Sequence, residues 1–161
     1  RERYRPQVRG VRFVGAEQST PAPGVLEAIS SADAVVLAPS NPITSIGPIL
    51  AVPSIREALC ETQAPVAAIS PIVSGAAVSG PAGALMAAQK LPVSAAGVAR
   101  AYEDFLDILF VDERDADAAA VLDETGLHVH CANTIMKSAD DKAALAATVL
   151  DFVASSAARA G

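Results

Sequence analysis

The stretch Ala34-Val35-Val36-Leu37-Ala38 decides the fold class of this chain. All five residues are apolar, and Asp33 and Pro39 bound the run on either side. A short apolar run between breaking residues is typical of a strand that is covered on both faces. We therefore expect a central strand in a parallel sheet.

Strand and helix patterns alternate outward from this strand along the chain. Further strands are predicted at residues 8–14, 65–69, 108–112 and 127–131. Helices are predicted at residues 23–31, as two short helices within 46–59 that Pro48 and Pro53 interrupt, and at 82–89, 94–105, 118–124 and 140–158, with a loop at 75–81. This alternation predicts one α/β unit over residues 1–161, with a Rossmann-like, doubly wound, mostly parallel sheet and helices on both faces.

Composition excludes several classes of function. The chain has 161 residues, a formal net charge of −6 and only 4% aromatic residues, so nucleic acid is not an expected partner. Its apolar runs are broken well before the roughly 18 residues that a membrane span needs, and its first residues lack the apolar core of a signal peptide. We expect no membrane association, a cytoplasmic location, and reduced thiols at Cys60 and Cys131.

A polar loop follows the central strand directly. Ser40, Asn41, Thr44 and Ser45 offer hydroxyl and amide groups just after the apolar run. Ligands bind outside the carboxyl ends of the strands in open α/β sheets, and free N–H groups at a helix start suit an anion. The same pattern is also typical of a plain turn with a helix cap.

The chain resembles the 2-phospho-L-lactate transferases of coenzyme F-420 biosynthesis along nearly its whole length. The matching strings are Gly15-Ala16-Glu17, Pro21-Ala22-Pro23-Gly24-Val25, Pro39-Ser40-Asn41-Pro42, Thr44-Ser45-Ile46-Gly47-Pro48-Ile49-Leu50, Ser70-Pro71-Ile72-Val73, Gly97-Val98-Ala99-Arg100, Asp112-Glu113 and Asn133-Thr134-Ile135-Met136-Lys137. Their order and spacing also agree with that family.

The resemblance implies a metal-dependent transfer in the cytoplasm. The ribityl hydroxyl of the deazaflavin Fo would attack the phospholactyl, or phosphoenolpyruvyl, phosphorus of a guanosine diphosphate-activated donor and release GMP. The resemblance assigns substrate binding to Ser40, Asn41, Pro42, Thr44, Ser45, Gly47, Ser70, Arg100 and Thr134, but it assigns no catalytic residue and no metal ligand. It also suggests a homodimer.

Departures from the family pattern predict that this chain is the C-terminal part of a larger transferase. The loop after the 65–69 strand has Ser74-Gly75-Ala76 and Ser79 where family members often carry lysines, and Asn133 stands where Asp is frequent. The family's N-terminal glycine-rich turn and its metal-holding acidic residues are absent from this sequence. Ligands for Mg²⁺ are therefore expected from an N-terminal half.

Alternative interpretations of particular residues remain open. The related gluconeogenesis-factor-like family binds nucleotide sugars in a regulatory role, although the Ala-Pro-Ser-Asn-Pro-Ile-Thr-Ser loop favours the transferases. His128 and His130 share a strand face but lack a nearby third metal ligand, so packed or exposed histidines are expected. The acidic run 112–117 is expected to form a solvated loop with a helix cap.

Overall fold

A four-stranded parallel sheet forms the centre of the molecule. The computed structural model describes residues 7–160. The strands are β1 (Val35–Leu37), β2 (Val66–Ile69), β5 (Ile108–Asp112) and β6 (His128–Ala132), in the order β1-β2-β5-β6. Val35 pairs with Val66, Ala67 with Ile108, and Ile108 with His128. The α/β class and the parallel sheet that the sequence predicts are confirmed.

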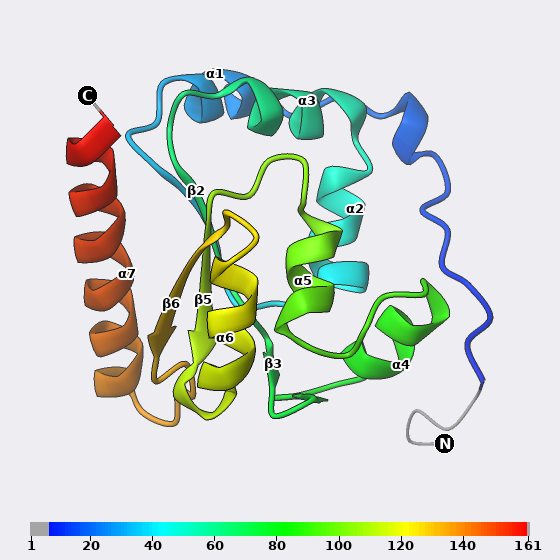
Figure 1. Cartoon of the computed structure of the whole chain (residues 1–161). Coiled ribbons are helices and arrows are strands. Elements are labelled where there is room, and N and C mark those ends of the chain that lie inside the picture. Colours follow the sequence, from blue (N-terminus) through cyan, green and yellow to red (C-terminus); the bar gives the residue numbers. More distant parts are fainter. Residues whose placement is uncertain (1–6, 161) are drawn as a thin grey trace.

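Helices cover both faces of this sheet (Figure 1). On one face lie α1 (Val25–Ser30), α2 (Gly47–Leu50), α3 (Pro53–Glu61), α4 (Ala82–Ala88), α5 (Ala95–Ala101) and α6 (Ala116–Asp123). Among residues 7–160, the long helix α7 (Ala139–Ala160) is the only helix on the other face. Short helical turns η1 (Ala16–Gln18), η2 (Pro42–Ile46) and η3 (Glu113–Asp115), and a hairpin of β3 (Ile72–Val73) and β4 (Ala76–Ala77), complete the chain.

The strands divide their side chains between two hydrophobic cores. Leu37, Ala68 and Leu109 point into the larger core, which α2 to α6 cover. Ala67 and Phe110 point to the opposite face and pack against α7. This alternation follows from the two-residue period of a strand, and it explains why β1, β2 and the first four residues of β5 are all apolar.

Prolines and a glycine set the helical connections. Pro53 begins α3, and Pro48 lies in the first turn of α2, where no intrahelical N–H bond is lost. Gly97 is buried in α5, and a Cβ atom there would lie 1.8 Å from the carbonyl oxygen of Pro92. Only glycine allows α5 to pack this closely on the preceding turn.

Three predictions about the fold are wrong. Residues 8–14 form no strand; Val8 and Val11 instead pack at the side of the larger core, where no strand of the sheet is adjacent. The 34–38 run forms β1 at the edge of the described sheet rather than at its centre. The 75–81 segment is not all loop, because Ala76–Ala77 pairs with β3.

The remaining predicted elements are confirmed with shifted ends. For example, α5 ends at Ala101, before a turn through Tyr102 to Phe105. In residues 7–160 no single helix is long and apolar enough to cross a membrane; the two segments Pro42–Leu50 and Pro53–Glu61 reach that length and composition only together, and they are bent by 87°.

Candidate functional site

A pocket of about 400 Å³ lies where the loops after β1, β2 and β6 converge. It opens at the carboxyl ends of these strands, the edge at which open α/β sheets bind ligands. Six of the predicted site residues line it: Ser40, Asn41, Thr44, Ser45, Ser70 and Thr134. The fold therefore brings together residues that are up to 94 positions apart in the sequence (from 40 to 134).

Asn41 builds the wall of the pocket that follows β1. Its Oδ1 atom accepts hydrogen bonds from the backbone N–H groups of Ile43 at 2.9 Å and Thr44 at 3.2 Å. Its carbonyl oxygen accepts from the N–H groups of Ser45 and Ile46. Asn41 thus acts as the cap of η2, which is the role that its residue type favours before a helical turn.

The hydroxyl groups on this wall remain free of the protein. Thr44 and Ser45 are exposed and Ser40 is half-buried. Within the described part of the chain, none of their hydroxyl groups hydrogen bonds to another protein group. These groups can donate to or accept from a ligand without breaking any bond of the fold.

Ser70 forms the floor of the pocket and is already engaged. It is fully buried; its hydroxyl donates to the carbonyl oxygen of Ile72 at 3.0 Å and accepts from the N–H of Ile72 at 3.2 Å. Its own N–H donates to the carbonyl oxygen of Phe110, which extends the pairing of β2 with β5. Ser70 therefore shapes the turn after β2, and only an acceptor lone pair remains for a ligand.

Thr134 lines the pocket and is held by a buried carboxylate, Asp112, whose role in the site the sequence analysis did not predict. Asp112, at the end of β5, is 2% exposed, and its Oδ2 atom accepts from the N–H of Thr134 at 3.1 Å and from its hydroxyl at 3.0 Å. Asp112 also accepts from the N–H of Arg114, so it caps η3 as expected but is not solvated. The signal that could have found it is an Asp that directly ends a fully apolar strand.

The pKa of Asp112 is lowered. Burial alone would raise the pKa of this carboxyl group, but hydrogen bonds from the N–H of Arg114 and from Thr134, together with the charge of Arg114, outweigh the burial. Asp112 is therefore ionised at neutral pH. Because the Thr134 hydroxyl donates its proton to this carboxylate, the lone pairs of the Thr134 oxygen are left to accept hydrogen bonds from a ligand.

The β3–β4 hairpin leads into the outer lip of the pocket. Its turn residues Ser74 and Gly75 both have positive φ, at 50° and 74°, which is the geometry of a tight hairpin turn. The N–H of Ser74 donates to both carboxylate oxygens of Asp115 at 3.1 and 2.9 Å. Val78 and Ser79 follow β4 and line the pocket, and Val78 is 55% exposed.

The remaining predicted site residues lie outside this pocket. Pro42 and Gly47 line a separate cavity beside Phe13, and a Cβ atom on Gly47 would lie 2.8 Å from the Phe13 ring. Gly47 thus provides space for Phe13 and η2. Arg100 is near the end of α5 and lines a third cavity with Leu106 and Leu127. These two leucines directly precede β5 and β6, so Arg100 lies toward the amino ends of these strands. Ligand contacts of these three residues stay predictions.

The described residues offer no metal centre. Among them, no group of three or more His, Cys, Asp or Glu side chains is placed to hold a metal ion. The ring of His130 packs against Phe110 and Phe152, with centroids 5.5 and 4.6 Å away. The packed-histidine interpretation of His130 is therefore correct.

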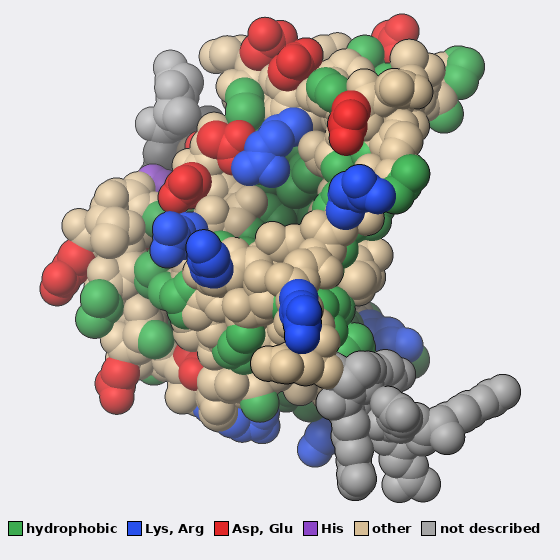
Figure 2. Space-filling view, turned by 90° about the vertical axis from the view of Figure 1, so that its right-hand side faces the viewer, with side chains coloured by type: hydrophobic (Ala, Val, Ile, Leu, Met, Phe, Trp, Pro, Cys, Tyr) green, Lys and Arg blue, Asp and Glu red, His purple; other side chains and the backbone are tan. Residues whose placement is uncertain are grey.

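Charge is also sparse around the candidate site. All the pocket-lining side chains that the structure describes are neutral. On the face opposite α7, Lys and Arg side chains lie among polar and apolar ones and do not merge into one continuous basic surface in that view (Figure 2). The negative charge of a phosphate ligand would be met here by hydroxyl and amide groups rather than by cations.

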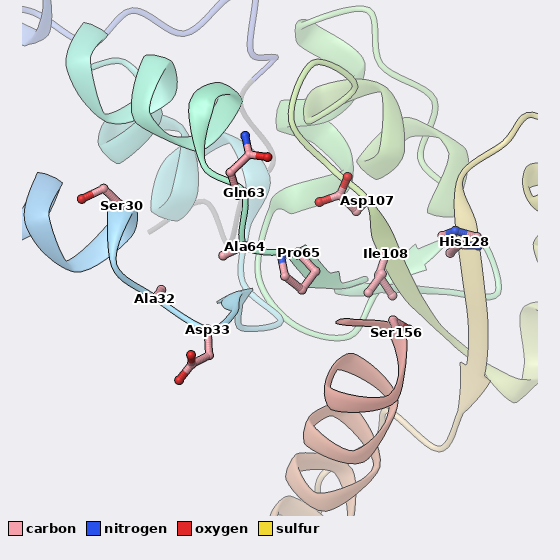
Figure 3. A pocket seen from close by; sticks show the side chains of 10 residues that line it. All are labelled: Ser30, Ala32, Asp33, Gln63, Ala64, Pro65, Asp107, Ile108, His128 and Ser156. Carbon is pink, nitrogen blue, oxygen red and sulfur yellow. The ribbon is translucent and has the colours of Figure 1, made fainter. Parts of the chain in front are cut away.

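A larger cavity of about 570 Å³ lies at the other end of the sheet (Figure 3). It is lined by residues that precede the strands, such as Asp33, Asp107 and His128, and by Ser156 of α7. The carboxylate of Asp107 accepts from the N–H of Val66 at 2.8 Å. This cavity lies between the beginnings of β1, β2, β5 and β6, and it does not gather a set of free hydrogen-bond donors as the first pocket does.

A parallel sheet with a pocket of hydroxyl and amide groups at the carboxyl ends of its strands defines a Rossmann-like α/β protein. Comparison with known families makes this more specific. The family model described as 2-phospho-L-lactate transferase CofD matches residues 1–150. The chain belongs to this family.

Curated relatives carry two different names. The chain is 44% identical over 149 residues to a 2-phospho-L-lactate transferase of Methanosarcina mazei, a match that covers 92% of this chain and 48% of the relative. It is 45% identical over 146 residues to one of Methanococcus maripaludis, covering 91% and 46%. It is 48% identical over 140 residues to a phosphoenolpyruvate transferase of Streptomyces griseus, covering 86% and 44%. The chain thus spans slightly less than half the length of these relatives.

Proposed function

We propose that this chain forms the donor-binding part of a transferase that completes the core of coenzyme F-420. In this reaction the ribityl hydroxyl oxygen of Fo bonds to the phosphorus of the phospholactyl or phosphoenolpyruvyl group. The bond from that phosphorus to the bridging oxygen of the guanosine diphosphate donor breaks, and GMP leaves. The observation that carries the proposal is the convergence of Ser40, Thr44, Ser45 and Thr134 on one pocket in a chain of this family.

The pocket suits the polar part of such a donor. Phosphoryl transfer depends on positioning and on charge stabilisation more than on a covalent protein nucleophile. The free hydroxyl groups of Thr44 and Ser45 supply donors for phosphate or ribose oxygens, and Asn41 holds their backbone in place. Thr134, oriented by Asp112, presents acceptor lone pairs to a donor hydroxyl or amide.

The described residues do not fit a Mg²⁺ ion. The one buried carboxylate near the pocket, Asp112, already binds Thr134 and Arg114, and the side chains lining the pocket carry no charge. If the transfer requires Mg²⁺, its ligands come from residues of a longer polypeptide, as the sequence interpretation expects, and a homodimer remains a prediction of the family resemblance.

The two names among the relatives leave the three-carbon acid open. A lactyl and an enolpyruvyl group differ by only a few atoms, and discrimination at that scale requires a polar contact or close packing. The activated donor therefore remains a class, a guanosine diphosphate ester of a three-carbon acid.

Release of GMP tests the proposal. The 161-residue chain is incubated with Fo and lactyl diphosphoguanosine, with and without Mg²⁺, alone and together with the part of the Methanosarcina mazei relative that it does not match. We expect background rates for the chain alone and turnover for the mixture. Absence of turnover by a folded mixture with either the lactyl or the enolpyruvyl donor would reject the assignment.

A further inference from the structure

Both outer strands of the sheet, β1 and β6, lack a neighbouring strand on one side in residues 7–160, and β1 is the outer strand that leads into the Asn41 wall of the candidate pocket. The N–H of Val35 donates to the carbonyl oxygen of Pro65 at 3.0 Å, which pairs β1 with β2. Alternate residues of a parallel strand bond to the same neighbour, so the N–H and C=O groups of Val36 face away from β2. Its side chain is 41% exposed although the sequence of β1 is that of a fully covered strand.

An apolar groove of about 270 Å³ runs between this edge and α7. Val36, Ala38 and Ile69 line it from the sheet, and Leu145, Ala146, Val149 and Leu150 line it from α7. Leu150 is 61% exposed. Because α7 packs on β2, β5 and β6 residues and leaves Val36 uncovered, the sheet face above β1 has room for a second helix.

We infer that this edge and groove bind one further strand and helix. The strand would pair with β1 in parallel, and the helix would lie beside α7 with its apolar side on Val36 and Leu150. Its source is the part of the longer relatives that this chain does not match, which is about half of their length. The inference goes beyond the proposed transfer and rests on it only for the existence of that longer polypeptide.

The order of the strands supports this occupant over a second copy of the chain. The described strands run β1-β2-β5-β6 in chain order without a reversal, and their connections lie on the face opposite α7. A doubly wound sheet reverses its order at a point flanked by parallel strands, and its ligand crevice lies at that point. A strand on the free side of β1 would create that reversal next to the pocket after β1 when its own connection crosses the α7 face, where the added helix would lie. Two copies joined edge to edge by a two-fold axis would instead pair their β1 strands antiparallel.

Co-purification and titration test this inference. The tagged 161-residue chain is expressed with the unmatched part of the Methanosarcina mazei relative, and the complex is sized by sedimentation. We expect a one-to-one complex, and slower hydrogen exchange of the Val36 amide than in the chain alone. Val36→Lys should weaken binding by more than ~100-fold, because a charge would be buried in an apolar contact.

Two further variants keep the test decisive. Leu150→Lys, at a position that is 61% exposed, should fold and also weaken the complex, whereas Val121→Lys on α6, at 65% exposed, should change affinity less than ~2-fold. Circular dichroism of each variant alone checks that it is folded. Absence of a complex, or a complex that survives both groove substitutions, overturns the inference. So does self-association of the chain that Val36→Lys and Leu150→Lys abolish. A complex without GMP release would reject the proposed transfer and leave the docking intact.

Discussion

The two cavities at opposite ends of the sheet use their polar groups differently. The larger one lies before the strands and is lined by groups such as the carboxylate of Asp107. This carboxylate accepts a hydrogen bond from the N–H of Val66 and thereby links the beginning of β5 to the beginning of β2. The smaller one, after the strands, combines an engaged floor with a wall of free hydroxyl groups. Cavity volume alone would select the end before the strands, whereas the direction of the strands and the free hydroxyl groups both select the end after them.

The largest expected effect is a difference in stability between substitutions of the carboxylates at the two ends, Asp112 and Asp107. Asp112→Asn should lower the free energy of unfolding by about 2–3 kcal/mol, since a buried charge that accepts several hydrogen bonds is lost. Asp107→Asn, at an exposed position with one such bond, should cost about 1 kcal/mol or less. Denaturant titrations of both variants measure the difference; equal losses would show that the two ends are held alike.

The contribution of Asp112 to stability depends on pH. The folded-state pKa of Asp112 is lowered, so its contribution is fully present above the pKa of the unfolded chain, roughly 4, and is lost as pH falls through the lower folded value. Asp112→Asn has no such group to titrate. The gap in stability between the parent chain and this variant should therefore narrow as pH falls below about 4.

Two substitutions at Asn41 distinguish its role as the cap of η2 from its predicted contact with the ligand. Asn41→Asp keeps an acceptor for the N–H groups of Ile43 and Thr44, so stability should hold. The added negative charge should nonetheless weaken GDP binding by about 1–2 kcal/mol, because it repels a phosphate. Asn41→Ala should lower both stability and affinity by about 1 kcal/mol. Unchanged GDP affinity of the folded Asp variant in calorimetry would remove Asn41 from the binding wall.

A smaller effect is expected at the free hydroxyl groups. Ser45→Ala should weaken GDP binding by about 1 kcal/mol without changing stability, since its hydroxyl has no partner in the described chain. Ser156→Ala is the matched control at the other cavity, where the hydroxyl donates to the carbonyl oxygen of Phe152. Calorimetry should show no change for that control. Equal affinities for the two variants would place the nucleotide elsewhere.

The smallest effect is expected at Arg100. This residue lines a cavity toward the amino end of β5, so Arg100→Lys should alter GDP affinity by less than about 0.3 kcal/mol. Turnover of the same variant with the complementary part of a relative tests the predicted contact with another portion of the substrates. A marked loss in GDP binding would contradict the separation of the two cavities.

The sequence predicted what depends on local pattern. Continuous apolar runs located β1, β2 and β5, and the polar string from Ser40 to Ser45 located one wall of the pocket, because both signals lie within a few neighbouring residues. The alternation at residues 8–14 was misleading. A half-buried segment beside a core shows the same alternation as a strand, and only the tertiary structure determines whether a neighbouring strand is there to pair with it.

The rest of the site depends on distant contacts. Nothing in the sequence pairs Asp112 with Thr134, since 22 residues separate them and the bond forms only when β5 and β6 lie side by side. Arg100 was selected for the chemistry of its guanidinium group, and α5 places it outside this pocket, beside residues that precede β5 and β6, so its ligand contact stays a prediction. Side-chain chemistry identifies a class of ligand, whereas the direction of the element determines whether that side chain can reach it.

The bond between Ser74 and Asp115 gives this molecule a built-in spectroscopic reporter. An amide proton donated to a carboxylate is held in a charge-assisted hydrogen bond, and such protons resonate downfield of the main amide envelope. The Ser74 signal should therefore stand apart in a nitrogen–proton correlation spectrum. Because its hairpin leads directly into Val78 and Ser79 at the lip, a ligand that displaces the lip should shift this one signal. Occupancy of the pocket becomes measurable in the unmodified chain, without turnover and without a label on the ligand.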